Sequence, residues 1–146
     1  MPLEQFFLSY GKQDRAPGEF VESVRIPRPS PDALVSIVKL SKRFDSDISG
    51  VCGAFALRIA DGIVTEARVA FGGMAGIPAR APRCEAELTG RPWSADTVEA
   101  AAQALVQDYE PIDDLRGSAA WRRKAAANLL RRLWAAQTEP VSVLHG

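Results

Sequence analysis

Short apolar stretches with a two-residue period fill the first half of the chain, which is typical of strands. Residues 33–42, ALVSIVKLSK, alternate regularly and predict a strand. Residues 19–27, EFVESVRIP, alternate less regularly and stop at a proline, which predicts an edge strand. The proline-rich residues 27–32 predict a break between the two strands.

Residues 50–71 predict a β-hairpin around Asp61 and Gly62. A two-residue turn at this point would pair apolar residues of one strand with charged residues of the other. A three-residue loop, 60–62, with Gly62 left-handed keeps one face apolar, so we favour that register. It predicts the pairs Ile59–Ile63, Leu57–Thr65, Phe55–Ala67, Gly53–Val69 and Val51–Phe71.

The apolar period changes to that of helices after the glycine pair at 72–73, where positive φ angles or a close backbone approach end the strand. Helices are predicted within 79–90, 94–109 and 117–137. Ser94 and Ser118 are the expected N-caps of the second and third helices. The third helix has the expected buried stripe Ala126, Leu129, Leu130 and Leu133.

The order of these elements predicts the fold class. Strands come first and helices last, which favours α+β: an antiparallel sheet of about four strands (N-terminal), covered on one face by about three helices (C-terminal). The length of 146 residues fits one domain, which we place at residues 1–136, with a tail at 137–146.

Charge and composition exclude several classes of function. The 18 Lys and Arg residues balance 18 Asp and Glu residues, so no net field favours nucleic acid or a membrane surface as a partner. No apolar run is long enough to span a bilayer, and the N-terminus lacks the pattern of a signal peptide. We therefore expect a cytoplasmic protein.

The chain carries few residues for metal or nucleophilic chemistry. With two cysteines and one histidine it cannot supply the four ligands of an iron–sulfur cluster or a structural zinc. Cys52 and Cys84 are read as small buried apolar residues, with a disulfide as the less favoured alternative. No P-loop, dinucleotide fingerprint or nucleophile elbow is present. We therefore expect no metal site and no catalytic residue.

A basic face is predicted on the last helix. It is formed by Arg122, Arg123, Lys124, Arg131 and Arg132. It carries no interleaved aromatic residues, so we interpret it as a solvated face and not as a nucleic-acid surface.

The most unusual stretch is the charged junction KRFDSDISGV, residues 42–51, between two predicted strands. A solvent-exposed loop with surface ion pairs would explain it. The alternative starts from Lys39, which shares a strand face with Val35 and Ile37 and leads into the junction. A cation beside an apolar surface suits an anionic or electron-rich flat ligand.

Four blocks in order resemble the C-terminal domain of the flavoprotein part of molybdenum hydroxylases, the carbon monoxide and xanthine dehydrogenases. They are PGEFVESVRIPRP, VKLSKRFDSDISGVCGAFALRI, ARVAFGGMAGIPARA and DLRGSAAWRRKAAANLLRRLW. The resemblance covers residues 4 to 135, and the second and third blocks are most similar to the small subunit of bacterial xanthine dehydrogenase.

This resemblance implies a domain that closes over FAD and shares it with an N-terminal FAD-binding domain. It also implies partners that carry [2Fe–2S] clusters and a molybdopterin-binding large subunit. Electrons would pass from purine hydroxylation through the clusters and FAD to NAD. The cluster cysteines and the glycine-rich FAD segment are missing from this sequence.

The resemblance also implies cofactor-facing residues. Lys39 matches a strand lysine that contacts the flavin, and Val21 an apolar residue near FAD. Arg43, Asp47 and Ile48 belong to the charged loop beside the flavin ring. The alternative hypothesis is an interaction or scaffold domain of the same fold without a flavin role.

Overall fold

A computed structural model describes residues 1–138 and divides them into a small N-terminal arm and an α+β body. The arm, residues 1–32, contains a 3₁₀ helix, Leu3–Gln5, and a two-stranded ribbon, β1 (Phe7–Ser9) and β2 (Lys12–Gln13). The body contains β3 (Ala33–Leu40), β4 (Val51–Ala60), β5 (Ile63–Gly72), β6 (Ala79–Arg80), α1 (Pro82–Leu88), α2 (Ala95–Leu105) and α3 (Ala119–Thr138).

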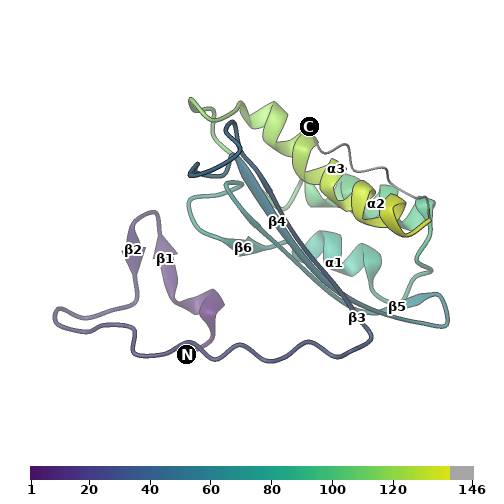
Figure 1. Cartoon of the computed structure of the whole chain (residues 1–146), viewed down its shortest axis with the longest axis horizontal. Helices are drawn as coiled ribbons and strands as arrows, with labels where there is room; N and C mark the ends of the chain where they lie inside the picture. Colours follow the sequence, from purple (N-terminus) through teal and green to yellow (C-terminus); the bar gives the residue numbers. More distant parts are fainter. Residues whose placement is uncertain (139–146) are drawn as a thin grey trace.

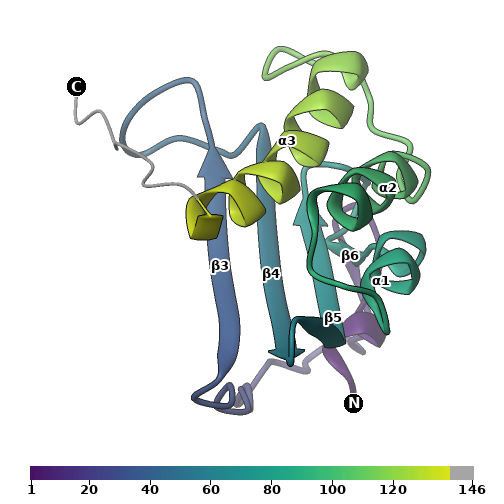
Figure 2. The same cartoon turned by 90° about the vertical axis from the view of Figure 1, so that its right-hand side faces the viewer.

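The predicted fold class is confirmed. The strands of the body form one antiparallel sheet in the order β3-β4-β5-β6. The three helices cover one face of this sheet, as the edge-on view in Figure 1 and the view onto the helices in Figure 2 show. None of the helices within residues 1–138 is long and apolar enough to cross a membrane.

The core lies between the sheet and the helices. Phe55 and Phe71 meet edge to face at 5.6 Å between ring centroids, and Phe71 meets Tyr109 at 5.9 Å. Around these rings pack buried aliphatic residues of both layers: Val51, Leu57, Val69, Leu88, Leu105, Leu130 and Leu133. The predicted stripe of α3 is therefore confirmed as its buried face.

The register predicted for the β4–β5 hairpin is wrong. Asp61 and Gly62 both have positive φ angles, 52° and 75°, and form a two-residue turn that pairs Ala60 with Ile63. A β-bulge then leaves Thr65 outside the ladder, so Leu57 faces Ala67. The extra residue restores the apolar face that the three-residue loop was expected to secure.

The strand predicted at 19–27 is also wrong, because these residues form no ladder and are exposed. Three prolines at 27, 29 and 31 remove backbone donors, and β3 begins only at Ala33. In Figure 1 the whole arm, residues 1–32, lies on the side of the sheet away from the helices. It presents the apolar side chains of Phe20, Val24 and Ile26 to solvent.

The helices begin close to the predicted positions. The Ser94 hydroxyl accepts from the Thr97 amide at 3.4 Å, and the Ser118 hydroxyl accepts from the Trp121 amide at 3.2 Å, so both N-caps are confirmed. The first helix is shorter than predicted, because residues 79–80 pair with β5 as β6. Residues 139–146 lie outside the described residues, so the predicted domain boundary at 136 stays a prediction.

Two glycines with positive φ angles give a test of how closely the backbone packs. A β-carbon on Gly73, φ 80°, would lie 2.4 Å from the Gly50 carbonyl oxygen, whereas one on Gly62, φ 75°, would meet nothing within 4 Å. We expect Gly62→Ala to lower the free energy of unfolding by about 1 kcal/mol, from backbone strain alone. Gly73→Ala should cost at least about 3 kcal/mol, because backbone must also move. Urea unfolding measures both, and equal losses would contradict the close approach.

Candidate functional site

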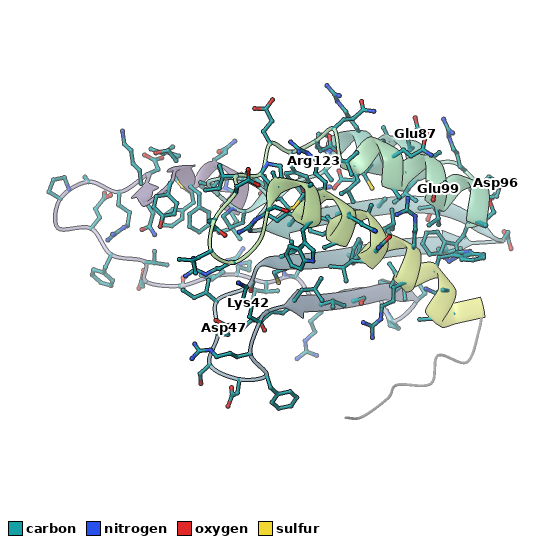
Figure 3. The ribbon with its side chains drawn as sticks, turned by 90° about the horizontal axis from the view of Figure 1, so that it is seen from above. Lys42, Asp47, Glu87, Asp96, Glu99 and Arg123 are labelled. Atoms are coloured by element: carbon teal, nitrogen blue, oxygen red, sulfur yellow. The ribbon has the colours of Figure 1, made fainter. Side chains whose placement is uncertain are left out.

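The charged junction forms a nine-residue loop, 41–49, between β3 and β4. Its base is closed by the Leu40–Val51 pair and by a 2.8 Å hydrogen bond from the Gly50 amide to the Leu40 carbonyl. Figure 3 shows Lys42 and Asp47 on this loop, beyond the end of the sheet. A tight turn could also join two strands paired in this way. The longer loop therefore needs internal contacts of its own to be ordered.

Asp47 organises the loop. One carboxylate oxygen accepts from the backbone amides of Lys42 and Arg43, both at 3.0 Å, and the other accepts from the Ile48 amide at 2.9 Å. The Arg43 guanidinium adds an ion pair at 3.6 Å. Only 17% of the Asp47 side chain is exposed, so this residue is a structural centre of the loop.

The same contacts shift the titration of Asp47. The backbone amide of Arg43, the amides of Ile48 and Lys42, and the Arg43 charge hold the pKa of this carboxyl below its usual value. A carboxylate that accepts several amide hydrogen bonds is stabilised in its charged form. Asp47 is therefore ionised at neutral pH and satisfied within the loop.

Lys39 lies where the alternation predicted, on the sheet face away from the helices. It pairs with Cys52, and its Nζ donates to the Asp47 carbonyl at 2.5 Å. From the sequence, an external ligand was the expected partner of this cation. The structure instead gives it a partner in its own loop, while the side chain stays exposed and keeps further donors for a second acceptor.

The other loop residues point outward. The Arg43 guanidinium donates to the Ser46 carbonyl at 3.0 Å but remains 71% exposed, and Ser46 adopts a positive φ angle of 49°. Ile48 and Phe44 are both exposed, and Phe44 is completely so. The loop thus combines a fixed backbone with apolar and cationic side chains that face solvent.

A pocket of about 780 Å³ lies between this loop and the segment 110–118. The Lys42 ammonium crosses it at one side and donates to the Leu115 carbonyl at 2.5 Å. The lining includes three cationic residues, one aromatic and two aliphatic side chains, and a carboxylate that is already engaged within the loop: Lys42, Arg43, Arg116, Trp121, Ile48, Leu115 and Asp47. Such a lining suits an anionic ligand that carries a flat ring.

Val21 is not brought to this pocket. It lines a separate hollow within the N-terminal arm, next to Phe20 and Val24. In Figures 1 and 2 the segment that leads into β3 lies at the end of that strand opposite to loop 41–49. Of the five predicted residues, the structure groups Lys39, Arg43, Asp47 and Ile48 and leaves Val21 apart.

The uncovered face of the sheet continues from the loop. Its surface carries Val35 and Ile37 of β3, and Ile37 is 72% exposed. Opposite them stand the small residues Ala56 and Ala54 of β4. This gives a flat apolar strip with the Lys39 cation at its end, which fits a planar ring that gains negative charge on reduction.

The glycine pair at 72–73 does not form an equivalent site for a pyrophosphate. Of these two adjacent glycines, Gly72 is the last residue of β5 and Gly73 follows it, and the Gly73 carbonyl accepts from Arg122 at 2.7 Å. Phosphates are usually bound by backbone amides of a free glycine-rich turn at a helix N-terminus. Within residues 1–137, no group of three or more His, Cys, Asp or Glu side chains could hold a metal ion.

Arg122 contradicts the prediction of a solvated basic face on α3. Only 3% of it is exposed, and its guanidinium pairs with the Asp114 carboxylate at 2.6 Å. Arg131 is also engaged, because it forms a double hydrogen bond with Glu99 of α2, at 2.7 and 2.9 Å. The spacing of charges on one helix could not reveal these partners, because both lie outside that helix.

The prediction of a buried cysteine is confirmed for Cys84 and is wrong for Cys52, which is only partly buried. Cys84 and Cys52 are both free, and Cys84 is buried in the core. Burial raises the pKa of the Cys84 thiol well above its usual value, with further contributions from Asp108 and Glu85. Cys84 lies away from the candidate site, whereas Cys52 stands opposite Lys39 in the β3–β4 ladder.

The sequence and the fold were compared with those of known proteins. Residues 36–137 match the family model of the CO dehydrogenase flavoprotein C-terminal domain. The chain belongs to this family. It thereby represents the flavoprotein C-terminal domain of molybdenum hydroxylase-type oxidoreductases, as the sequence resemblance predicted.

Relatives of this flavoprotein domain act on different substrates. The nicotinate hydroxylase hnxS of Emericella nidulans is 33% identical over 92% of this chain, and the xanthine dehydrogenase of the same organism is 34% identical over 87%. A carbon monoxide dehydrogenase from Hydrogenophaga pseudoflava, solved without the Mo-pyranopterin moiety of its cofactor, superposes with a TM-score of 0.82. It shares 28% identity over 88% of this chain.

The relatives are much longer than this domain. The chain spans 10% of each of the two Emericella proteins and 44% of the carbon monoxide dehydrogenase chain. In these homologues the matched region is therefore one part of a larger enzyme that contains further domains or subunits.

The contacts of Asp47 predict a pH dependence of the loop. Its folded-state pKa lies below the ordinary Asp value of about 3.9. The hydrogen bonds of the ionised carboxylate therefore stabilise the loop fully above that ordinary value, and this stabilisation is lost as the pH falls through the lower folded-state pKa. In an NMR titration the amide protons of Lys42, Arg43 and Ile48 should shift with a common midpoint below that ordinary value. Asp47→Asn should abolish the transition. A midpoint at or above the ordinary Asp value would show that these hydrogen bonds do not form in solution.

Proposed function

We propose that this domain covers the flavin of a xanthine dehydrogenase-type molybdenum hydroxylase and shares that FAD with a separate FAD-binding unit. The observation that carries the proposal is the position of Lys39, a cation at the end of an uncovered apolar strip and beside a structured charged loop. FAD, when bound, supplies the two-electron redox chemistry. The side chains of this domain orient the ring and set its electrostatic surroundings.

The proposed contacts follow the shape of the surface. Val35 and Ile37 would lie against one side of the ring, and the Lys39 ammonium would face its electron-rich edge. Ile48 would contribute an apolar contact from the loop, and Arg43 an exposed positive charge. Val21 would reach the cofactor only through the N-terminal arm, which lies on the same side of the sheet as Lys39.

The same function implies an electron path and a set of partners. Electrons from purine hydroxylation would reach the flavin through [2Fe–2S] clusters and leave to NAD. The cationic pocket beside the loop, with Trp121 at one wall, supports a nucleotide acceptor in this position. The N-terminal FAD-binding and iron–sulfur domains and a molybdopterin-binding large subunit would be the partners.

The test is the reduction potential of the flavin in the assembled enzyme. A cation near the ring stabilises the reduced, negatively charged form, so Lys39→Met should lower the potential, by about 30 mV for a tenfold change in the two-electron equilibrium. Lys39→Arg should restore most of the difference. Lys124→Met, which removes an exposed cation from α3, is the matched control and should leave the potential unchanged.

Potentiometric titration separates this function from a scaffold role. If the potential is the same in Lys39→Met as in the unchanged protein, the cation does not face the flavin. The domain would then be a structural element of the enzyme, and the site assignment of Lys39 would be wrong.

A further inference from the structure

Arg122 joins three distant segments of the chain at the base of the candidate site. One guanidinium nitrogen, Nη1, donates to the carbonyls of Gly50, at the end of loop 41–49, and of Gly73, just after β5. The Nη2 nitrogen pairs with Asp114, and Nε donates to the Gly117 carbonyl at 3.4 Å. The hydrogen bonds of this buried cation therefore reach both sides of the 780 Å³ pocket, the end of loop 41–49 at Gly50 and the turn 114–117.

The two carbonyls converge because glycine allows it. A β-carbon on Gly73 would lie 2.4 Å from the Gly50 oxygen and 3.2 Å from Nη1 of Arg122. Gly50 itself is fixed from two directions, because its amide donates to Leu40 and its carbonyl accepts from Arg122. The C-terminal end of loop 41–49 is thus attached to α3 through one side chain.

The N-terminal end of the loop depends on the same centre. Lys42 donates to the carbonyl of Leu115, which belongs to the turn 114–117. Asp114 shapes this turn by accepting from the amides of Arg116 and Gly117, at 2.7 and 3.2 Å, and the same oxygen accepts from Arg122. Arg122 therefore holds the segment to which Lys42 is attached.

We propose that Arg122 is a positioning residue that sets the place of loop 41–49 and so the electrostatic surroundings of the flavin. It acts through the Gly50 carbonyl and through Asp114 and does not touch the cofactor. A buried guanidinium is retained only when its donors are satisfied, and here the acceptors are the Asp114 carboxylate and the backbone carbonyls of Gly50, Gly73 and Gly117. The effect on the flavin rests on the function proposed above, whereas the effect on the loop does not.

Hydrogen exchange tests the effect on the loop in the isolated chain. Arg122→Lys keeps the charge but loses the fork that reaches several acceptors at once. We expect the bonded amides of Lys42, Arg43, Ile48 and Gly50 to exchange at least about tenfold faster, with unchanged protection in β4 and β5. Arg123→Lys changes the neighbouring arginine on α3 and is the matched control.

The milder variant Asp114→Asn keeps the three carbonyl acceptors of Arg122, on Gly50, Gly73 and Gly117, and removes the charge of the ion pair. It should speed exchange in the loop and in the turn 114–117, and it decides the question if Arg122→Lys does not fold. Unchanged exchange in the loop, or equal loosening of loop and core, would overturn the positioning role and leave Arg122 as a general stabilising residue.

The flavin potential of the assembled enzyme separates the two proposals. A faster-exchanging loop with a shifted potential in Arg122→Lys, and neither change in Arg123→Lys, supports both. A faster-exchanging loop with an unchanged potential supports the positioning role and counts against the flavin-facing role of the loop.

Discussion

Burial of only one face of the sheet is the constraint on which the rest of this structure depends. The helices remove the side of Phe55, Leu57 and Val69 from water, and this is where the folding energy of the body comes from. The other side keeps exposed Val35 and Ile37 beside the small residues of β4. A domain that leaves such a strip uncovered is suited to work against another surface, and the greater length of its relatives is consistent with that use.

The loop between β3 and β4 extends that surface. Its charged residues are held in place by hydrogen bonds within the loop. Asp47 gathers three backbone amides, and Lys39 binds the carbonyl of the same residue. A preorganised charged loop needs little reorganisation when charge develops nearby, which is the arrangement that favours electrostatic tuning of a cofactor. Under the proposed function, the domain would influence the chemistry of the flavin through fixed charge and shape.

Much of the fold could be predicted, because strand and helix periods act locally. The face shared by Lys39, Val35 and Ile37 and the capping serines follow from neighbouring residues alone. The hairpin register could not be predicted, since the bulge at Thr65 compensates for the turn and leaves no mark in the alternation. The strand expected at 19–27 requires a partner strand, which no local pattern reveals. Arg122 was read as a surface cation because its acceptors, Gly50 and Gly73, lie 72 and 49 residues away.

In the proposed function, the flavin and its binding unit meet the uncovered face of the sheet. Hydrogen exchange of this domain, compared between the isolated chain and the assembled flavoprotein with and without FAD, tests this contact most directly. We expect assembly to protect β3 and loop 41–49, and FAD to add protection at Lys39 and its neighbours in the loop, while α1 and α2 stay unchanged. Protection confined to the outer surfaces of α1 and α2, with β3 and the loop unaffected, would contradict the account.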